Sequence, residues 1–373
     1  MEFEARTLFE EGGLPILKGM TVESTDQIEG DFHFPVVVKA QVMTGGRGKA
    51  GGVRLAADET ELKKVASEIL GMKIKQFTVQ KVLIVEKADI QQEMYLSILL
   101  DRNTKKHRIV FSPQGGVDIE QTAQSNPELI FKMDIDPLLG YNSQDGIYLA
   151  DKAGLTGDLK KEFAALVGKL YGVVKANDCL LAEINPLITT QDGHLIALDA
   201  KISVDDSGIF RHSRLVEYKD AHTVEPLVRE AAQYRFLYIP CDPEGNVVIM
   251  SNGSGMLMSC IDHITRHGNK VSAVLDLGGG STADRIEHGI RILFQTPGAK
   301  ILFINIFGGI TRCNEVALGI RNAIENQKIE KPIVVRFEGT NKDEGLKIIE
   351  GLPCVIWADG LIQGEEAVRR QLQ

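Results

Sequence analysis

The sequence predicts a two-domain protein, with a mixed α+β domain first and then an α/β domain built on an open, doubly wound parallel sheet. From residue 245 onward, five short apolar runs alternate with helical patterns, which is typical of a parallel sheet with helices on both faces. Upstream of residue 240, strand-like and helix-like segments lack that alternation. The segment Pro240–Gly245 interrupts the periodicity with turn-forming residues, so we expect domains of residues 1–240 and 241–373.

The C-terminal domain is expected to contain five parallel strands, each followed by a helix. Right-handed crossovers bring the strand-to-helix turns to one edge of such a sheet, and ligands bind at that edge. The predicted strands are Val247–Met250, Val271–Leu275, Lys300–Ile306, Ile333–Phe337 and Val355–Ala358.

Three of these strand-to-helix turns are rich in Gly, Ser, Thr and Asn, at residues 252–255, 278–282 and 308–312. Glycine lets a ligand approach the backbone, and the free N–H groups of a helix N-terminus favour an anion. Arg312 adds a charge that suits a carboxylate or a phosphate. The alternative is tight turn geometry alone, but three such turns at one edge favour an anion site.

The N-terminal domain is expected to combine two helices with several strands. Ala5–Glu11 and Leu159–Lys175 have helical patterns. Leu180–Ile184 and Leu195–Leu198 are expected to pair around a turn that contains Asp192-Gly193. Further strands are expected at Val36–Ala40, Val82–Val85 and Met94–Leu100.

Composition excludes several classes of function. A net charge of −9 over 373 residues argues against a general nucleic-acid surface. No apolar run is long enough to span a membrane. The five cysteines form no CxxC pair, which indicates a reducing compartment. The N-terminus has no signal or transit pattern, so we expect a cytoplasmic protein, or a mitochondrial matrix protein whose transit peptide has been removed.

A lysine at a strand end and a glycine-rich loop form the most distinctive local feature. Lys39 ends a predicted strand, and five glycines follow among residues 45–52, interleaved with Arg47 and Lys49. A fixed lysine and a loop that folds over phosphates suit a nucleoside triphosphate. A solvated hairpin explains the same loop about equally well. The loop has neither the Walker spacing nor the Rossmann pattern.

Two acids and an amide suggest a magnesium site. Glu183 and Asn185 are two residues apart on a predicted strand and share a face, and the hairpin brings Asp199 beside them. Mg²⁺ prefers such oxygen ligands, completed by substrate phosphates. A hairpin with exposed polar positions is the alternative, but the flanking apolar runs indicate burial, and buried acids need a partner.

The charged segment from Glu86 to Glu93 offers carboxylates at a strand end. One could accept hydrogen bonds from ribose hydroxyls, and another could reach the base or the metal. Taken alone, the segment is an ordinary charged loop.

Over nearly the whole chain, these motifs resemble the β subunits of succinyl-CoA synthetases (succinate–CoA ligases). The resemblance implies an ATP-grasp domain followed by a flavodoxin-like CoA-ligase domain. The matching motifs are Lys39, GGRGKAGG at 45–52, EINPL at 183–187, LDAK at 198–201, NGSG at 252–255, LDLGGGST at 275–282 and NIFGGITRC at 305–313.

The resemblance also implies roles for individual residues. Glu183 would steady a phosphohistidine, and Asn185 and Asp199 would hold Mg²⁺. The segment around Ala88 is slightly shorter than in the family. The nucleotide residues implied are Lys39, Gly46, Arg47, Gly48, Glu86, Ala88 and Glu93, and the acid-site residues are Asn252, Gly309, Ile310 and Thr311.

In this family, ATP or GTP phosphorylates a histidine, the phosphoryl group passes to succinate, and CoA attacks the acyl phosphate. The family's histidine lies in a Gly-His-Ala-Gly sequence of the α subunit. This chain has eight histidines, none in that sequence and none in a glycine-rich turn. The resemblance therefore implies an α-subunit partner that brings the histidine and the CoA site.

Two alternatives stay open at this point. A malate–CoA ligase uses the same chemistry, and Ala200 in LDAK favours it, whereas GGITR at 308–312 favours the succinate enzyme. A regulatory nucleotide-binding subunit without turnover is the other, although the intact Lys39, Asn185 and Asp199 argue against it. The choice between ATP and GTP and the number of subunits stay open as well.

Overall fold

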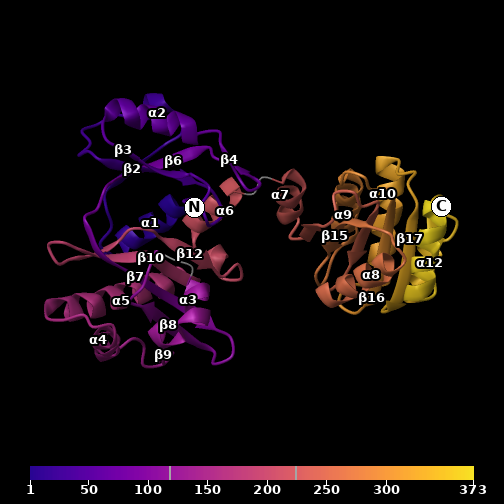
Figure 1. Cartoon of the computed structure of the whole chain (residues 1–373). Helices are drawn as coiled ribbons and strands as arrows, with labels where there is room; N and C mark the ends of the chain where they lie inside the picture. The colour runs from indigo at the N-terminus through magenta and orange to yellow at the C-terminus, as the bar shows by residue number, and fades with distance from the viewer. Residues whose placement is uncertain (117–118, 223–224) are drawn as a thin grey trace. The chain divides into compact units, whose positions relative to one another are not determined.

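The computed structural model describes residues 1–116, 119–222 and 225–373. They form two compact units, Met1–Tyr218 and Lys219–Gln373. Figure 1 shows the run of elements along the chain. Each unit has its own apolar cores, so each is described by itself.

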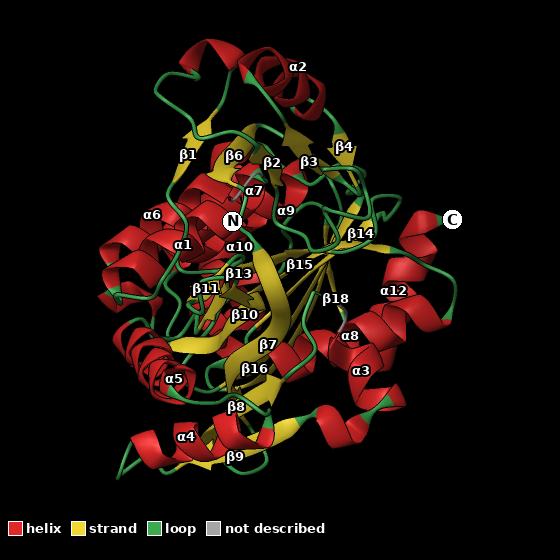
Figure 2. Ribbon diagram, turned by 60° about the vertical axis from the view of Figure 1, so that its left-hand side comes forward, coloured by secondary structure: helices red, strands yellow, loops and turns green. Residues whose placement is uncertain are grey.

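A small antiparallel sheet with strand order β1-β6-β2-β3 forms one part of the first unit. Helix α2 (Glu59–Ile69) covers it, with Leu62, Ala66 and Ile69 fully buried (Figure 2). The α2 N-terminus is capped by Asp58, which accepts a hydrogen bond from the Glu61 N–H. The strands are β1 (Gly19–Val22), β2 (Val36–Gln41), β3 (Val53–Ala56) and β6 (Lys81–Glu86), and β4 (Lys73–Ile74) pairs with β5 (Phe77–Thr78).

A larger antiparallel sheet, with order β11-β10-β7-β8-β9 and β12 beside β10, forms the other part of the first unit. Helices α1 (Glu2–Glu11), α4 (Ser143–Lys152) and α5 (Asp158–Ala176) share its core. The strands are β7 (Ile90–Asp101), β8 (Lys106–Ser112), β9 (Phe131–Ile135), β10 (Cys179–Thr190), β11 (Leu195–Ala197) and β12 (Lys201–Val204). Helix α3 (Ile119–Ser125) also belongs to this unit, which ends within helix α6 (Ser213–His222). The expected hairpin around Asp192-Gly193 is confirmed, since β10 pairs with β11.

The second unit confirms the expected doubly wound sheet. Its strand order is β13-β15-β14-β16-β17-β18, and all pairs except β13–β15 are parallel. The parallel strands follow the order 2-1-3-4-5 of flavodoxin-like sheets. They are β14 (Val247–Ser251), β15 (Val271–Asp276), β16 (Ile301–Gly308), β17 (Ile333–Gly339) and β18 (Val355–Trp357).

Helices cover both faces of this sheet. One face packs against α7 (Pro226–Gln233), α9 (Ala283–Gln295), α10 (Cys313–Gln327) and α11 (Lys342–Ile349). The other packs against α8 (Ser254–Arg266) and α12 (Leu361–Leu372). In the described part of the chain, no helix has the length and apolarity needed to cross a membrane.

The units divide at Tyr218 and Lys219, upstream of the boundary that the sequence predicts near Pro240–Gly245. Strand β13 (Leu237–Pro240) pairs antiparallel with β15, and Phe236 and Tyr238 are buried in the core of the second unit. This edge strand precedes the regular strand–helix alternation, so periodicity alone does not assign it to the parallel sheet.

A glycine sets the closest approach of two helices in the second unit. A Cβ at Gly319 of α10 would lie 2.6 Å from the Ile286 side chain on α9 and 2.7 Å from the Ala283 carbonyl oxygen. We expect Gly319→Ala to lower the free energy of unfolding of this unit by about 1–3 kcal/mol through overpacking. Urea unfolding followed by fluorescence of Trp357, the only tryptophan, measures it.

Gly255→Ala in α8 is the matched control, because its Cβ would meet no atom within 4 Å. Equal stability of the Gly319→Ala variant and the wild type would contradict this close packing of α9 against α10.

Candidate functional site

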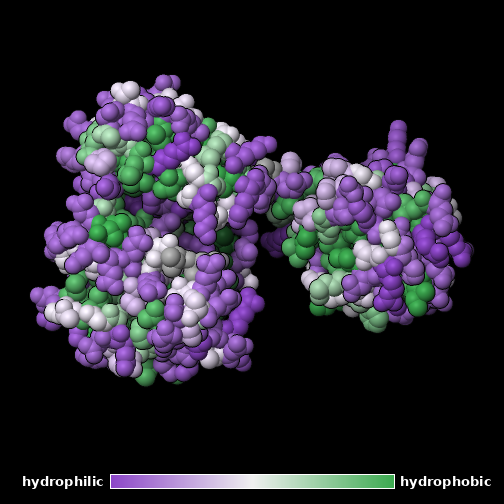
Figure 3. Space-filling view, viewed as in Figure 1, coloured by the Kyte–Doolittle hydropathy of each residue, from purple (hydrophilic) through white to green (hydrophobic). Residues whose placement is uncertain are grey.

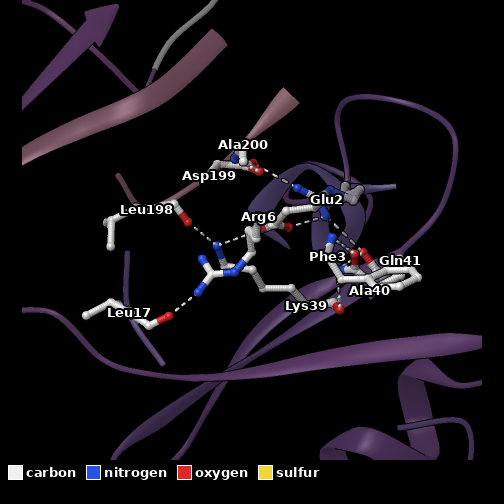
Figure 4. Close-up of polar contacts among 11 residues, drawn as sticks. Glu2, Phe3, Arg6, Leu17, Lys39, Ala40, Gln41, Leu198, Asp199 and Ala200 are labelled. Carbon is white, nitrogen blue, oxygen red and sulfur yellow. Dashed lines mark hydrogen bonds and ion pairs between the residues drawn. The ribbon is translucent and has the colours of Figure 1, made fainter. Parts of the chain in front are cut away.

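Four charged side chains from three distant segments meet in the first unit. Glu2 begins α1, Lys39 lies on β2, Arg47 lies in the β2–β3 loop, and Asp199 lies between β11 and β12. Lys39 Nζ is 3.0 Å from Glu2 Oε1, and the Arg47 guanidinium bonds Glu2 Oε2 and, at 2.8 Å, Asp199 Oδ2. Lys39 Nζ also donates to the Leu198 carbonyl at 2.7 Å (Figure 4). We name Glu2, Lys39, Arg47 and Asp199 the charge cluster.

Local sequence patterns position these side chains. Strand β2 buries Val36, Val38 and Ala40 in the core under α2, so Lys39 points to the opposite face of the sheet. Helix α1 buries Leu8 and Phe9 in the core of the larger sheet, which fixes its first turn. The charge cluster therefore lies between the two sheets of this unit. Figure 3 shows that the surface of the unit is hollowed.

The two carboxylates of the charge cluster are not equally well compensated by its cations. Burial raises the pKa of Glu2, but the charges of Lys39 and Arg47 outweigh burial and lower it overall. Burial and the negative charge of Glu2 raise the pKa of Asp199, in spite of Arg47 and Lys39. Since 33% of the Asp199 side chain is exposed, this carboxylate can take a further cation.

Asn185 lies opposite Asp199, as the sequence predicts. The flanking pairs Leu187–Ala197 and Glu183–Lys201 place these two residues across from one another. Asn185 Oδ1 accepts the Gly116 N–H at 2.8 Å. A carboxylate and an amide oxygen suit Mg²⁺, which keeps water and phosphate oxygens as its other ligands. Among the described residues, no group of three His, Cys, Asp or Glu could hold a metal.

Glu183 lies on the same strand as Asn185, with 17% of its side chain exposed. The Tyr95 hydroxyl is 3.4 Å from Glu183 Oε2, and Lys201 Nζ is 3.6 Å from the same atom. Burial, together with the charge of Glu183, raises the pKa of Tyr95 well above its ordinary range. Tyr95 therefore stays a neutral hydrogen-bond donor beside this carboxylate.

Three further residues predicted to bind the nucleotide, Glu86, Glu93 and Ala88, lie on β6, on β7 and in the connection between them. Glu93 lies on β7, and a Cβ at Gly116 would be 1.9 Å from its Oε2, so Glu93 is near the Asn185 contact. Glu86 ends β6 and pairs with Val36 of β2, and Ala88 follows it in the β6–β7 connection.

The glycine loop leaves its backbone accessible. Gly46 has a φ of +82°, and a Cβ at Gly46 or Gly48 would meet no atom within 4 Å. The loop closes on itself through the Gly52 N–H, which donates to the Arg47 carbonyl at 2.8 Å. Phosphate groups can therefore approach the backbone at Gly46 and Gly48.

Hydrogen bonds join the glycine-rich turns of the second unit at the carboxyl edge of its sheet. The Asn252 amide donates to the Phe307 carbonyl at 2.8 Å and accepts the Phe307 N–H at 3.0 Å. The Thr311 hydroxyl accepts the Gly280 N–H and donates to the Gly278 carbonyl, each at 3.1 Å.

The four residues predicted for the acid site differ in their exposure to solvent and in their existing hydrogen bonds. Thr311 is 1% exposed and its hydroxyl is already bonded on both sides, so it fixes the turns. Ile310 is 83% exposed beside Gly309, which leaves the turn surface open to a ligand. Asn252 links two turns in the same way as Thr311.

Sequence reasoning missed two residues at these sites. Glu2 is one of two acids in the first turn of α1, a position that helix electrostatics alone explains. Asp276 ends β15, accepts hydrogen bonds from the Ser254 hydroxyl and the Gly278 N–H at 2.9 Å each, and joins two turns. Its position at the end of an apolar run was the available signal.

Comparison with known proteins matches each unit to a protein family. Residues 1–189 match the ATP-grasp domain family, and residues 250–355 match the CoA-ligase family. The fold and the site thus define an ATP-grasp ligase subunit with a CoA-ligase domain.

Curated relatives match almost end to end. The chain is 42% identical to the GDP-forming succinate–CoA ligase subunit beta of Thermus thermophilus, over 95% of this chain and 94% of that protein. It is 44% identical to the ADP-forming subunit beta of Desulfatibacillum aliphaticivorans, over 93% and 92%. The chain therefore belongs to the family of succinate–CoA ligase β subunits.

A solved structure shares the fold at lower identity. ATP citrate lyase from Methanothrix soehngenii, in complex with citrate and coenzyme A, superposes with a TM-score of 0.73 at 21% identity, over 91% of this chain and 87% of that one.

Substitution of Thr311 tests whether its hydroxyl stabilises the turns at residues 278–282 and 308–312. We expect Thr311→Val to lower the free energy of unfolding of the second unit by about 1–3 kcal/mol, because a buried N–H and a buried carbonyl lose their partner. Thr311→Ser keeps the hydroxyl and is the matched control. Urea unfolding followed by Trp357 fluorescence compares them, and equal midpoints for both variants would contradict the role of the hydroxyl.

Proposed function

We propose that this chain binds Mg²⁺ with ATP or GTP between the two sheets of its first unit and contributes a succinate site at the carboxyl edge of its second unit. Its activity would be the reversible conversion of succinate, CoA and nucleoside triphosphate to succinyl-CoA, nucleoside diphosphate and phosphate. The observation that carries the proposal is the meeting of Lys39 and Arg47 with Asp199 opposite Asn185, in a chain whose full-length relatives are succinate–CoA ligases.

The charge cluster suits phosphoryl transfer. Lys39 provides a fixed cation for the phosphates, and Arg47 provides a second one from a loop that can close over them. Bound Mg²⁺, held by Asn185 and Asp199, would offset the charge of the phosphate oxygens. Such transfers depend on positioning and on charges aimed at the reacting oxygens, and these side chains contribute those effects.

The nucleophile has to come from another chain. None of the eight histidines lies in a glycine-rich turn, and the family's Gly-His-Ala-Gly sequence does not occur here. We therefore propose an α-subunit partner that carries the phosphorylated histidine and the CoA site. Glu183, held between Tyr95 and Lys201, is placed to accept a hydrogen bond from that imidazole while it faces the nucleotide.

The γ-phosphoryl group would move to the histidine with release of the nucleoside diphosphate. A succinate carboxylate would then take it, giving succinyl phosphate and free histidine. Attack of the CoA thiolate would form the thioester and release phosphate. Splitting one difficult step into three suits nucleophilic catalysis.

Removal of the proposed metal ligand is the sharpest test. The full chain is mixed with a cognate α subunit, Mg²⁺ and γ-labelled ATP or GTP, and labelled phosphohistidine is measured. We expect Asp199→Ala to lower the rate of labelling by about 100-fold or more, with the two subunits still eluting together. Asp192→Ala, at the exposed tip of the same hairpin, is expected to match the wild type.

Two outcomes would contradict the proposal. Absence of phosphohistidine with the wild type under both nucleotides would overturn the enzymatic function and favour a regulatory subunit. Loss of subunit assembly in Asp199→Ala would make Asp199 structural.

The acid is tested with a panel of succinate, malate and other short dicarboxylates on the same assembled enzyme. We expect the highest kcat/KM with succinate. Malate differs by one hydroxyl, and a pocket without a partner for it discriminates by leaving it unpaired. A higher kcat/KM with malate would replace succinate by malate and leave the nucleotide site unaffected.

A further inference from the structure

We propose that Glu2 is a positioning residue of the nucleotide site, holding Lys39 and Arg47 where the triphosphate needs them. This inference rests on the proposed function of the charge cluster and adds a residue from the first turn of α1 to that site.

The geometry of Glu2 is specific to two cations. Its side chain is 2% exposed, and each carboxylate oxygen takes one cation, Oε1 the Lys39 ammonium and Oε2 the Arg47 guanidinium. The partners are 37 and 45 residues away along the chain. A surface acid at a helix start would have no such fixed pair, because exposed ion pairs are weak and mobile.

Glu2 lies on a helix that is packed into the body of the unit, whereas Arg47 lies in a loop. Helix α1 packs Ala5, Leu8 and Phe9 into the core of the larger sheet. Arg47 lies in the glycine loop, where side chains at Gly46 and Gly48 would meet nothing within 4 Å. The anchors of the Arg47 guanidinium are Glu2, Asp199 and the Ala40 carbonyl.

Binding of the metal changes this balance. Asp199 is a proposed Mg²⁺ ligand, and a divalent cation beside it repels the Arg47 guanidinium at short range. Arg47 would then lose its ion pair with Asp199, and Glu2 would be its remaining carboxylate partner. Glu2 thereby keeps the guanidinium near the phosphates in the state that reacts.

Removal of the Glu2 charge leaves cations that repel one another. Lys39 and Arg47 form ion pairs with Glu2. Burial lowers the pKa of the nearby Arg6 overall, although the charges of Glu2 and Asp199 raise it. Without Glu2, the long Lys39 and Arg47 side chains turn toward solvent, and the triphosphate must order them again when it binds.

The test compares Glu2→Gln, Glu2→Asp and Glu10→Gln in the full-length chain with a C-terminal tag. Glu10 is exposed on the same helix and is the matched control. Isothermal titration with Mg-AMPPNP and Mg-GMPPNP measures affinity. We expect Glu2→Gln to weaken the better nucleotide about tenfold or more, the effect of losing one charge-assisted contact. Glu2→Asp, one methylene shorter, is expected to fall between the wild type and Glu2→Gln, and Glu10→Gln to match the wild type.

A second readout separates positioning from general destabilisation. Because trypsin is specific for Lys and Arg, the experiment compares its rates of cleavage after Arg47 in the glycine loop and after Lys105 in the exposed β7–β8 turn. Mass spectrometry of nucleotide-saturated protein gives the ratio of the two rates. We expect this ratio to rise several-fold in Glu2→Gln, because the Arg47 anchor is lost while the β7–β8 turn is unchanged.

Each outcome decides the proposal. Wild-type affinity in Glu2→Gln, or an equal rise of both cleavage rates, overturns it. If Glu2→Gln does not fold, Glu2→Asp decides by the same two measurements, and failure of both variants to fold makes Glu2 structural. A wild type that binds neither nucleotide overturns the proposed function itself, which separates that failure from failure of the Glu2 assignment.

Discussion

The site in the first unit depends on one buried carboxylate that neutralises two cations. Glu2 holds Lys39 from the small sheet and Arg47 from the glycine loop, while its own helix is packed against the larger sheet. Two cations that share one carboxylate would repel one another if that carboxylate were removed. The ion pairs therefore determine where Lys39 and Arg47, the proposed phosphate-binding groups, lie relative to Asp199, and they hold the two sheets of the unit together at the site.

The features that follow from side-chain periodicity could be predicted from the sequence. The two-residue period of β10 and its hairpin with β11 put Asn185 opposite Asp199, and repeated apolar runs predict the parallel sheet of the second unit. Glu2 could not be predicted in this way, because helix electrostatics already accounts for an acid in a first turn. The sequence did not predict strand β13 either. It is an antiparallel edge strand with Leu237 and Ile239 exposed, so it lacks the continuous apolar run of a central parallel strand.

The two proposed sites are built on different physical principles. In the second unit, neutral hydrogen bonds from Asn252, Thr311 and Asp276 tie the turns to one another, so the backbone is ordered before any ligand arrives. In the first unit, charges do the ordering, and the loop that carries Arg47 has open space around its glycines. A fixed edge suits a small acid that is recognised by shape, and a closing loop suits a triphosphate that has to enter and leave as a diphosphate.

Under the proposed function, incomplete neutralisation of Asp199 would allow the charge cluster to respond to a metal ion. If Arg47 fully balanced Asp199, a metal ion would have to break a strong buried pair before it gained anything. Instead, burial and the neighbouring charge of Glu2 raise the pKa of Asp199, so its ionised form is under-compensated and gains from a further cation. Glu2, the carboxylate that holds Lys39 and Arg47, would therefore favour a cation at Asp199, where we propose that Mg²⁺ binds. Binding of a metal ion at Asp199 would cost Arg47 its ion pair with Asp199 but leave its ion pair with Glu2, so no buried charge would be left without a partner.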